Sequence, residues 1–321
     1  MQDHCLYCGA DAITRIAEVE VARLIEVYRK GFGVDVERLF SDTSARLTLV
    51  SCRTCELRWF SPLVAGDDRF YEDLQKLPWY YQDDKPEYGY ASQHILPGDA
   101  VLEVGCGKGA FAPFLANGVQ YRGLEFNQLA VDKARGAGLD VEACSIAAEA
   151  ERVPASYDVV CHFQVLEHVS APRAFLVDCV RALRPGGRLI ITVPSEDSFL
   201  SIAEDAWLNM PPHHVTRWTD SALRFALAKL QLEAQEIWHE PVASFHAAWY
   251  RDVLINFGVK RLFGGRTVLA STHRGRRIAR LVRLLGQTPL LGDWVFASSV
   301  RAFSLRNRGH SVCVVARKPM A

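Results

Sequence analysis

The feature that most constrains the fold is a regular alternation of strand-like and helix-like segments after Ala100. The predicted strands cover 101–104, 121–125, 139–143, 157–161 and 188–193, and the predicted helices cover 110–117, 128–137 and 171–183. Strands that alternate with helices at this spacing form βαβ units, and hence a parallel sheet with helices on both faces. Ligands of such sheets bind beside the carboxyl ends of the strands, near the point where strand order reverses. The sequence therefore predicts an α/β domain with a site at that edge.

A glycine-rich loop, Gly105-Cys106-Gly107-Lys108-Gly109, follows the first predicted strand. Such a loop alone fits many nucleotide sites, but two acids sharpen the signal. Glu103 lies two residues before Gly105, where it can orient the loop or accept a hydrogen bond from a ligand amine. Glu125 ends the second strand, where an acid can bind both hydroxyls of a ribose, which favours an unphosphorylated adenosine. The loop is shorter than a Gly-x-Gly-x-x-Gly turn and no Lys-Ser/Thr pair follows it, which disfavours a dinucleotide site and a P-loop.

Five motifs in this order resemble those of class I S-adenosylmethionine-dependent methyltransferases. They are Val-Leu-Glu-Val-Gly-Cys-Gly-Lys-Gly at 101–109, Gly-Leu-Glu-Phe-Asn at 123–127, Tyr-Asp-Val-Val at 157–160, Val-Leu-Glu-His-Val at 165–169 and Leu-Arg-Pro-Gly-Gly-Arg-Leu at 183–189. The resemblance implies a Rossmann-like α/β fold with a seven-stranded sheet, helices on both faces and an antiparallel last strand at 310–316. It also implies an S-adenosylmethionine site formed by eight residues: Glu103, Gly105, Cys106, Gly107, Glu125, Phe126, Phe163 and Gln164.

Within that implied site, Gly105 and Gly107 face the methionine part of the cofactor, Glu125 the ribose and Phe126 the adenine. The family often has an acid after the third strand that meets the adenine amine, whereas this chain has Cys144-Ser145 there. We therefore expect backbone groups to supply the adenine contacts at that strand.

Nine cysteines divide into two groups. Five stand singly in apolar or strand-like runs and are expected to be small buried side chains: Cys106, Cys144, Cys161, Cys179 and Cys313. The other four form two pairs, Cys5-x-x-Cys8 and Cys52-x-x-Cys55, and two such knuckles supply four tetrahedral ligands for structural Zn²⁺. The 43 residues between the knuckles exceed the usual spacing, so we predict an insertion there with a helix over 19–28. The alternatives are a redox-active pair and two disulfides.

The chain is expected to have three parts. Residues 1–62 form a small zinc-ribbon-like module with a helical insertion, and 63–98 form a proline-interrupted linker rich in aromatic residues. The aromatic residues of the linker either join the two modules or cover the cofactor site as a lid. Residues 99–321 form the methyltransferase domain, with a helical insertion at about 243–308 before the last strand.

Two clusters are candidates for handling a methyl acceptor. The first, Pro211-Pro212-His213-His214, places two histidines after two stiffening prolines, and either His213 or His214 can act as a general base near neutral pH. In the alternative, the two histidines have only structural roles: one is hydrogen-bonded in the loop and the other stacks on Trp218. The segment resembles one found in bacterial methyltransferases that carry an amino-terminal Cys-knuckle module, several of them associated with surface glycans or secondary metabolites.

The second cluster is Gln164-x-x-Glu167-His168. It is similar to the Glu-x-x-Glu-His that binds a divalent metal in superfamily members that methylate catechol-like phenols. Glutamine is a poorer ligand than glutamate, so metal binding through Gln164 is disfavoured. We expect His168 to pack beside the cofactor or to cap a turn.

Charge and hydropathy limit the kinds of partner that the chain is expected to bind. The 37 basic and 37 acidic residues balance, which argues against a general nucleic-acid binder, and no signal peptide or long apolar window is recognisable. We expect a cytoplasmic protein. Residues 251–308 hold twelve Lys or Arg against two Asp, and this basic insertion is expected to lie at a membrane, to contact a second copy or to pack on the sheet.

The predicted function is O-methylation of a small molecule, sugar or glycan precursor, with S-adenosylmethionine as the cofactor and a histidine base. The first rival is a nucleic-acid methyltransferase that uses the zinc module and the basic insertion. The second is a non-catalytic scaffold that binds the cofactor without turnover.

Overall fold

The computed structural model describes residues 4–77, 80, 83–203, 206–262 and 308–320. The chain divides into two compact units, each described by itself below. The larger unit comprises 1–195, 206–238 and 311–321, and it contains the glycine loop, the cysteine pairs and the histidine segment. The smaller unit comprises 196–205 and 239–310.

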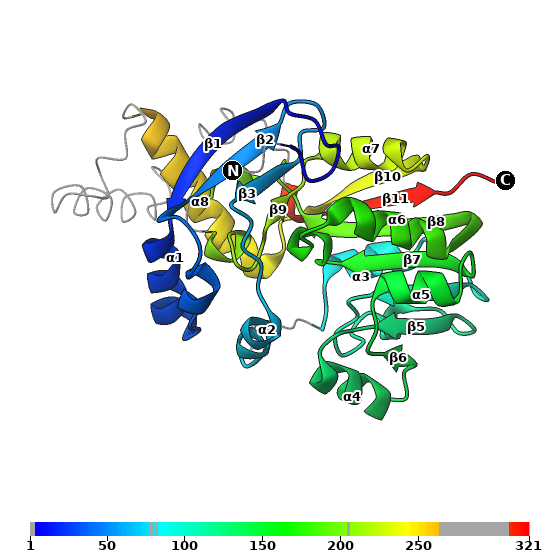
Figure 1. Cartoon of the computed structure of the whole chain (residues 1–321). Helices are drawn as coiled ribbons and strands as arrows, with labels where there is room; N and C mark the ends of the chain where they lie inside the picture. Colours follow the sequence, from blue (N-terminus) through cyan, green and yellow to red (C-terminus); the bar gives the residue numbers. More distant parts are fainter. Residues whose placement is uncertain (1–3, 78–79, 81–82, 204–205, 263–307, 321) are drawn as a thin grey trace. The chain divides into compact units, whose positions relative to one another are not determined.

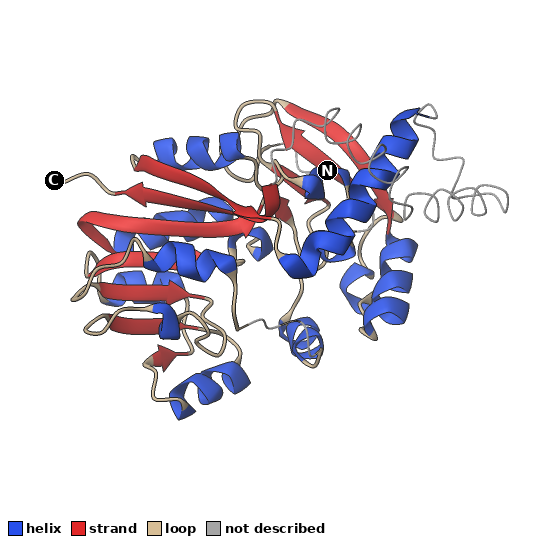
Figure 2. Cartoon of the chain, turned by 180° about the vertical axis from the view of Figure 1, so that it is seen from behind, coloured by secondary structure: helices blue, strands red, loops and turns tan. Residues whose placement is uncertain are grey.

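The centre of the larger unit is a seven-stranded sheet in the order β10-β11-β8-β7-β4-β5-β6 (Figures 1 and 2). Its strands are β4 (Ala100–Val104), β5 (Gln120–Leu124), β6 (Val141–Glu142), β7 (Tyr157–Phe163), β8 (Leu183–Pro194), β10 (Glu233–Pro241) and β11 (Arg308–Arg317). The pairs β4–β5, β4–β7, β5–β6 and β7–β8 are parallel, and β11 runs antiparallel to β8. The predicted Rossmann-like sheet with an antiparallel last strand is therefore confirmed.

Helices cover both faces of this sheet because successive strand residues point to opposite sides. On one face, Leu102, Val160 and Ile191 share a core with side chains of three helices: α5 (Ile146–Arg152), α6 (Pro172–Ala182) and α7 (Asp220–Lys229). On the other face, Val101 and Val159 pack with Tyr88 and Ala91 of α3 (Pro86–Ser92). Helix α4 (Gln128–Gly136) packs beside β6 through a small separate core.

Side chains at the helix starts fix where three of these helices begin. Asn127 accepts a hydrogen bond from the backbone of Ala130, Ser145 from that of Ala148, and Thr219 from that of Ala222. These N-caps satisfy donors that the first helical turn leaves without a partner.

A second, four-stranded sheet forms the amino-terminal part of the larger unit, in the order β1-β2-β3-β9. Strands β1 (Ile13–Glu20), β2 (Arg46–Cys52) and β3 (Arg58–Ser61) come from the first 62 residues, whereas β9 (Thr216–Arg217) directly follows the histidine segment. Antiparallel pairing places Arg58 opposite Arg217 and Trp59 opposite Thr216. The amino-terminal module and the histidine segment thus share one sheet.

The insertion between the cysteine pairs contains three short helical turns: α1 (Val21–Val27), a π-helix η1 (Tyr28–Phe32) and a 3₁₀ turn η2 (Glu37–Phe40). Leu24, Tyr28 and Phe40 are buried in a core that also contains Phe70 and Leu74 of α2 (Asp68–Gln75). The first helix of the linker therefore packs against the insertion.

One predicted helix is shorter than expected. The segment 110–117 forms only a 3₁₀ turn, η3 (Ala112–Phe114), because Pro113 lacks a backbone donor and Leu115 is extended. Two further 3₁₀ turns follow β8: η5 (Phe199–Ile202) belongs to the smaller unit and η6 (Trp207–Asn209) to the larger one.

In the smaller unit, α8 (Ala247–Leu262) follows η7 (Ser244–His246), and Trp249 and Tyr250 of α8 contact the ring of Phe199 edge-on. The arginine-rich helix predicted at 276–283 lies outside the described residues, as does most of the basic insertion. Among the described helices, none is long and apolar enough to cross a membrane.

Candidate functional site

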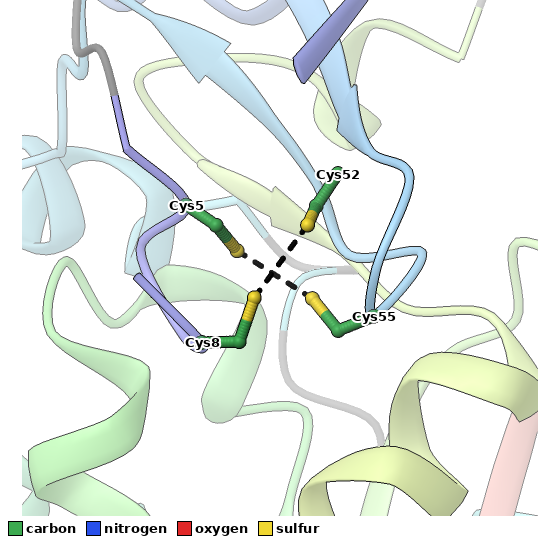
Figure 3. A group of neighbouring side chains, drawn as sticks. All are labelled: Cys5, Cys8, Cys52 and Cys55. Carbon is green, nitrogen blue, oxygen red and sulfur yellow. Dashed lines mark hydrogen bonds between the residues drawn. The ribbon is translucent and has the colours of Figure 1, made fainter. Parts of the chain in front are cut away.

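The four paired cysteines meet at one point (Figure 3). The Sγ atoms of Cys5 and Cys55 are 3.5 Å apart, those of Cys8 and Cys52 are 3.6 Å apart, and all four lie within 4.8 Å of one another. Backbone N–H groups two residues further along each knuckle, those of Tyr7 and Thr54, donate to Cys5 Sγ and Cys52 Sγ at 3.4 Å. The sequence prediction that these four residues come together is confirmed.

The donor set of this cluster fits Zn²⁺. Four thiolates at a Zn–S distance of about 2.3 Å lie about 3.8 Å apart in a tetrahedron, close to the sulfur separations found here. A hydrogen bond from the Cys55 thiol lowers the pKa of Cys5 to about 5, so the cluster already favours thiolate at one position. The same knuckle is tied to the larger sheet, because Tyr7 contacts Trp218 edge-on and donates from its hydroxyl to the Ala226 carbonyl.

The glycine loop and Glu125 form a connected unit at the carboxyl ends of β4 and β5. One carboxylate oxygen of Glu125 accepts from the Gly107 backbone at 2.9 Å, and the other accepts from the Asn127 backbone at 2.9 Å. Gly105 has a left-handed φ of 72°, and a Cβ there would lie 2.6 Å from Val165 Cγ2. Only glycine fits this position, which brings the loop directly against the segment that follows β7.

Glu103 is a buried carboxyl group near the end of β4, with 2% of its surface exposed. The Tyr121 hydroxyl donates to its Oε2 at 2.6 Å. Burial nevertheless raises the pKa of Glu103 to about 8, because the ionised form loses its hydration. A cation that reached this carboxylate would relieve that cost.

The other predicted cofactor residues differ in their surroundings. Phe126 is 73% exposed beside Glu125, so its ring is free to stack on a ligand. Phe163 lies in the core between the rings of Tyr88 and Phe111, at centroid distances of 4.9 and 4.6 Å. The Cys106 side chain packs in the small core beside α4, which leaves its backbone for any contact with a ligand.

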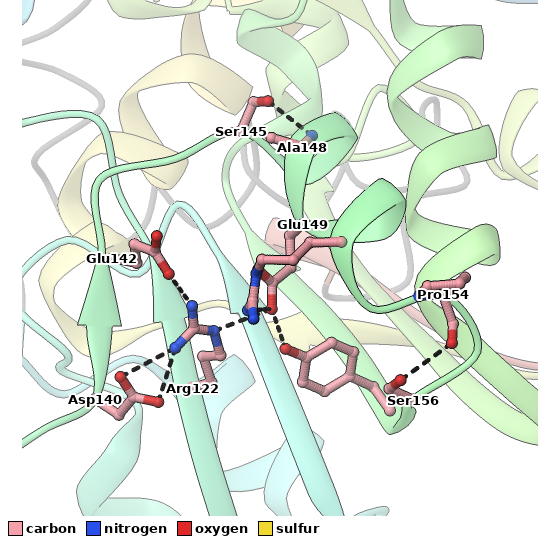
Figure 4. A network of polar contacts seen from close by, with 10 residues as sticks. Arg122, Asp140, Glu142, Ser145, Ala148, Glu149, Pro154 and Ser156 are labelled. Carbon is pink, nitrogen blue, oxygen red and sulfur yellow. Dashed lines mark hydrogen bonds and ion pairs between the residues drawn. The ribbon is translucent and has the colours of Figure 1, made fainter.

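The end of the third strand is occupied by a network of charges (Figure 4). The Arg122 guanidinium bonds to Asp140 at 3.0 and 3.1 Å, to Glu149 at 3.0 Å and to Glu142. Arg152 and the Tyr157 hydroxyl also bond to the fully buried Glu149. Each of these carboxylates has an arginine partner within the network, and Ser145 is engaged as the cap of α5.

Three imidazoles lie together beyond β7. His168 belongs to a 3₁₀ turn, η4 (Leu166–His168), and His213 and His214 belong to the loop before β9. One ring nitrogen from each lies within 4.8 Å of the other two. The loop is fixed to η4, because the Val215 backbone donates to the Glu167 carbonyl at 2.9 Å and the Thr216 hydroxyl to the Leu166 carbonyl.

The Nδ1 atom of each of these imidazoles faces an oxygen that accepts a hydrogen bond. Two of these oxygens are backbone carbonyls, and the third is the side-chain amide oxygen of Asn209. His168 Nδ1 lies 2.6 Å from the His213 carbonyl, His213 Nδ1 lies 2.9 Å from the Leu208 carbonyl, and His214 Nδ1 lies 3.0 Å from Asn209 Oδ1. The proton of each neutral ring is therefore assigned to Nδ1, which leaves Nε2 as the basic nitrogen. Burial lowers the pKa of His168 to about 4, so this ring is neutral at pH 7.

Glu167 lies beside two of the three imidazoles and is 1% exposed. Its Oε1 is 3.8 Å from the Nε2 atoms of His168 and His214, and neither of its oxygens has a hydrogen-bond partner among the described residues. Burial raises the pKa of this carboxyl group to about 8. Neither the burial of Glu167 nor its neighbours carried a separate signal in the sequence.

Aromatic residues of the linker form one wall of this cluster. The Tyr71 ring contacts His168 edge-on at 5.6 Å, and Phe70 lies 6.1 Å from His213. The Tyr80 hydroxyl is 2.9 Å from His213 Nε2 and donates to it, since Nδ1 carries the ring proton. The linker thus contacts the histidines, as the lid hypothesis requires, and also packs with the insertion, as the joining hypothesis requires.

The structure corrects the alternative that one histidine stacks on Trp218, and the cofactor role of Gln164 stays a prediction. His213 stacks on His214, with ring centroids 4.4 Å apart and planes 20° apart, whereas the ring of Trp218 contacts Tyr7. Gln164, predicted among the cofactor residues, directs its amide to Glu87 and Ser311 at 3.2 and 3.0 Å.

Comparison with known proteins agrees with this geometry. Residues 102–191 match the family described as a methyltransferase domain. The ubiquinone biosynthesis O-methyltransferase of Idiomarina loihiensis is 31% identical over 144 residues, which cover 42% of this chain and 55% of that protein. The enzyme of the same name from Burkholderia vietnamiensis is 36% identical over 140 residues, covering 41% and 59%. The chain therefore spans less than two thirds of the length of these curated relatives.

A S-adenosylmethionine-dependent methyltransferase from Archaeoglobus fulgidus has a TM-score of 0.49 and 17% identity, over 77% of this chain and all of that one. The matched segment 102–191 contains the glycine loop, Glu125 and Glu167-His168, on the parallel strands of the seven-stranded sheet. This part of the chain is thus similar to methyltransferase domains.

Proposed function

We propose that the protein transfers the methyl group of S-adenosylmethionine to an oxygen atom of a small-molecule acceptor. One observation carries the proposal: Val165 packs on Gly105, so the cofactor loop adjoins the turn that holds Glu167 and His168. A methyl donor on the loop would then lie beside a cluster of basic nitrogens. Two curated relatives that are named O-methyltransferases support oxygen as the accepting atom.

In the proposed complex the residues of β4 and β5 hold the cofactor. Glu125 would bind the ribose hydroxyls, Phe126 would stack beside the adenine, and Glu103 would face the ammonium group of the methionine part. The exposure of Phe126 and the burial of Glu103, which raises the pKa of its carboxyl group, support these roles. Gly105 and Gly107 would let the backbone approach the methionine part closely.

The acceptor proton would leave through the histidine cluster. The methyl group of S-adenosylmethionine is already electrophilic, so the protein mainly has to align the acceptor and assist loss of its proton. His213 or His214 would act as the base, with the hydrogen bonds to Leu208 and Asn209 holding Nε2 toward the acceptor. Sugars and glycan precursors, which carry several hydroxyl groups, are the acceptor class that we propose.

The four-cysteine cluster would bind a structural Zn²⁺. Four thiolate ligands leave no open coordination position, so this metal would stabilise the amino-terminal module and take no part in the transfer. Because β3 of that module pairs with β9, the metal would indirectly support the histidine loop.

The test uses the purified chain, methyl-labelled S-adenosylmethionine and a bacterial cell extract. After incubation, the label is measured in aqueous small molecules, in organic-soluble lipids and in macromolecules, with and without nuclease. Label on small molecules or on glycan-linked lipids, stable to nuclease, is the expected result. Label that nuclease releases from macromolecules would instead identify a nucleic-acid methyltransferase and contradict the proposal.

A further inference from the structure

The cluster of His168, His213, His214 and Glu167 combines three imidazoles with a buried acid whose carboxyl oxygens have no hydrogen-bond partner in the described part of the chain. One ring nitrogen from each histidine lies within 4.8 Å of the other two, and Glu167 Oε1 is 3.8 Å from the Nε2 atoms of His168 and His214. A buried carboxylate without a hydrogen-bond donor is costly, and a cation is one of the few groups that can offset that cost.

Each imidazole makes a hydrogen bond at Nδ1 of the kind that metal-binding histidines make with the ring nitrogen that does not bind the metal. A ligating histidine almost always donates its other ring N–H to a carbonyl, carboxylate or water, which fixes the tautomer and the ring plane. His168, His213 and His214 all have such a partner on Nδ1: the carbonyls of His213 and Leu208, and Asn209 Oδ1. Each ring therefore presents Nε2 as a potential ligand.

We propose that His168, His213 and His214, together with Glu167, bind a divalent first-row transition metal. Imidazole nitrogens with one carboxylate are the donors that zinc, iron, cobalt and manganese use, whereas Mg²⁺ prefers an octahedral shell of oxygens. The metal would be distinct from the one proposed at the cysteines, because no thiolate lies in this cluster.

The geometry requires only a small rearrangement. Nitrogen ligands at about 2.1 Å from a tetrahedral metal lie about 3.4 Å apart, so the rings would move together by on the order of 1 Å. The Tyr80 hydroxyl at 2.9 Å from His213 Nε2 would give up its hydrogen bond, and Tyr80 belongs to the linker rather than to the sheet. His168, with 19% of its side chain exposed, is the most accessible of the four.

The metal would also change how the acceptor loses its proton. A divalent cation lowers the pKa of a hydroxyl group that reaches it, so a metal held by this cluster would assist the proton loss that the proposed function assigns to the histidines. This consequence rests on the proposed function, whereas the metal binding itself does not.

The experiment titrates the purified full chain with Co²⁺ in the absence of S-adenosylmethionine and acceptor. Bound Co²⁺ is measured by equilibrium dialysis and by its visible spectrum, in which thiolate ligands give a charge-transfer band and imidazole ligands do not. We expect the chain to bind one equivalent of Co²⁺ that gives no thiolate charge-transfer band. The Co²⁺ affinity should fall at least tenfold in His214→Gln and in Glu167→Gln.

Two controls separate the sites. His94→Gln, which changes a histidine outside the cluster, should bind Co²⁺ like the wild type. Cys8→Ser should still bind the one equivalent of Co²⁺ that has no thiolate ligand. A tenfold excess of Mg²⁺ should not displace this Co²⁺. Glu167→Gln keeps the shape of the side chain and removes the buried charge, so it should remain folded by thermal melting even where a histidine variant does not.

The inference is overturned if the wild type binds no thiolate-free Co²⁺, or if both cluster variants bind it as tightly as the wild type does. Displacement by Mg²⁺ would also overturn the donor assignment. If the protein transfers methyl groups but binds no such Co²⁺, the proposed metal site is wrong and the methyltransferase proposal stands. Binding without any methyl transfer would support the metal and contradict the proposed function.

Discussion

Glu103 and Glu167 are both buried carboxyl groups beside the carboxyl ends of neighbouring strands, and they differ in what faces them. Glu103 receives a hydrogen bond from Tyr121, whereas Glu167 receives none from the described residues and faces two imidazoles. A protein that used these positions only for stability would gain more from apolar side chains there. Their placement is therefore best explained by ligands that carry positive charge.

Glu103 should make the stability of the ligand-free protein depend on pH. Its pKa in the folded protein, about 8, lies above the ordinary value of 4.5, so the folded state favours the protonated form. The free energy of unfolding should therefore fall by a few kcal/mol as the pH rises from about 5 to 8. Glu103→Gln keeps an acceptor for Tyr121 and removes this titration. Urea denaturation at pH 5 and pH 8 should show a smaller decrease for the variant, and equal decreases would contradict the assignment.

Replacing both His213 and His214 by Ala should reduce methyl transfer and preserve cofactor binding. Both side chains lie in the loop before β9, whereas the residues proposed to hold the ribose, adenine and methionine parts lie at or directly after the ends of β4 and β5. General acid–base assistance is worth roughly 10²–10⁴ in rate, so the loss should be at least a hundredfold. Turnover by label transfer and cofactor affinity by calorimetry give the two readouts. An unchanged rate would remove both histidines from the reaction.

At the scale of elements, the short strand β9 joins parts of the chain that are far apart in sequence. It pairs with β3 of the amino-terminal module, and the Phe60 backbone donates to the Val215 carbonyl at 3.2 Å. Cys52 ends β2 and Cys55 lies in the turn before β3, so the cysteine cluster fixes the strand on which β9 rests. The amino-terminal module is thus part of the framework of the histidine loop.

Cys52→Ser should therefore affect both modules. Losing one of four metal ligands should lower the bound zinc and reduce the melting temperature by roughly 5–10 °C, since structural zinc contributes folding energy directly. Cys144→Ser, which changes a single partly exposed cysteine outside the cluster, is the matched control and should leave the zinc content unchanged. Metal analysis and thermal melting are the measurements. A wild type that contains no zinc and melts like Cys52→Ser would contradict the structural site.

At the scale of the whole molecule, the sheet could be predicted because its signals are local. Apolar runs and the glycine loop each report on a few neighbouring residues, and together with the family resemblance they predicted a seven-stranded sheet with helices on both faces. The helix expected at 110–117 failed because Pro113 overrides an otherwise helical pattern.

The candidate site was only partly predictable, because many of its contacts join residues that are far apart in the sequence. The cysteine pairs and the two histidines are visible in the sequence, but the stacking of His213 on His214 and the hydrogen bond from Tyr80 depend on contacts over long sequence separations. The burial of Glu167 likewise arises from packing between η4, the loop before β9 and the linker. No periodicity within a single segment encodes such contacts.

The most direct test of the account is calorimetric titration of S-adenosylmethionine into the full chain. We expect one binding site, with affinity at least tenfold weaker in Glu125→Gln, because that carboxylate would bind the ribose and accepts a hydrogen bond from the Gly107 backbone. Glu151→Gln, an exposed change on α5, should bind like the wild type. No detectable binding by the wild type, or equal affinity in Glu125→Gln, would contradict the cofactor site on which the whole proposal rests.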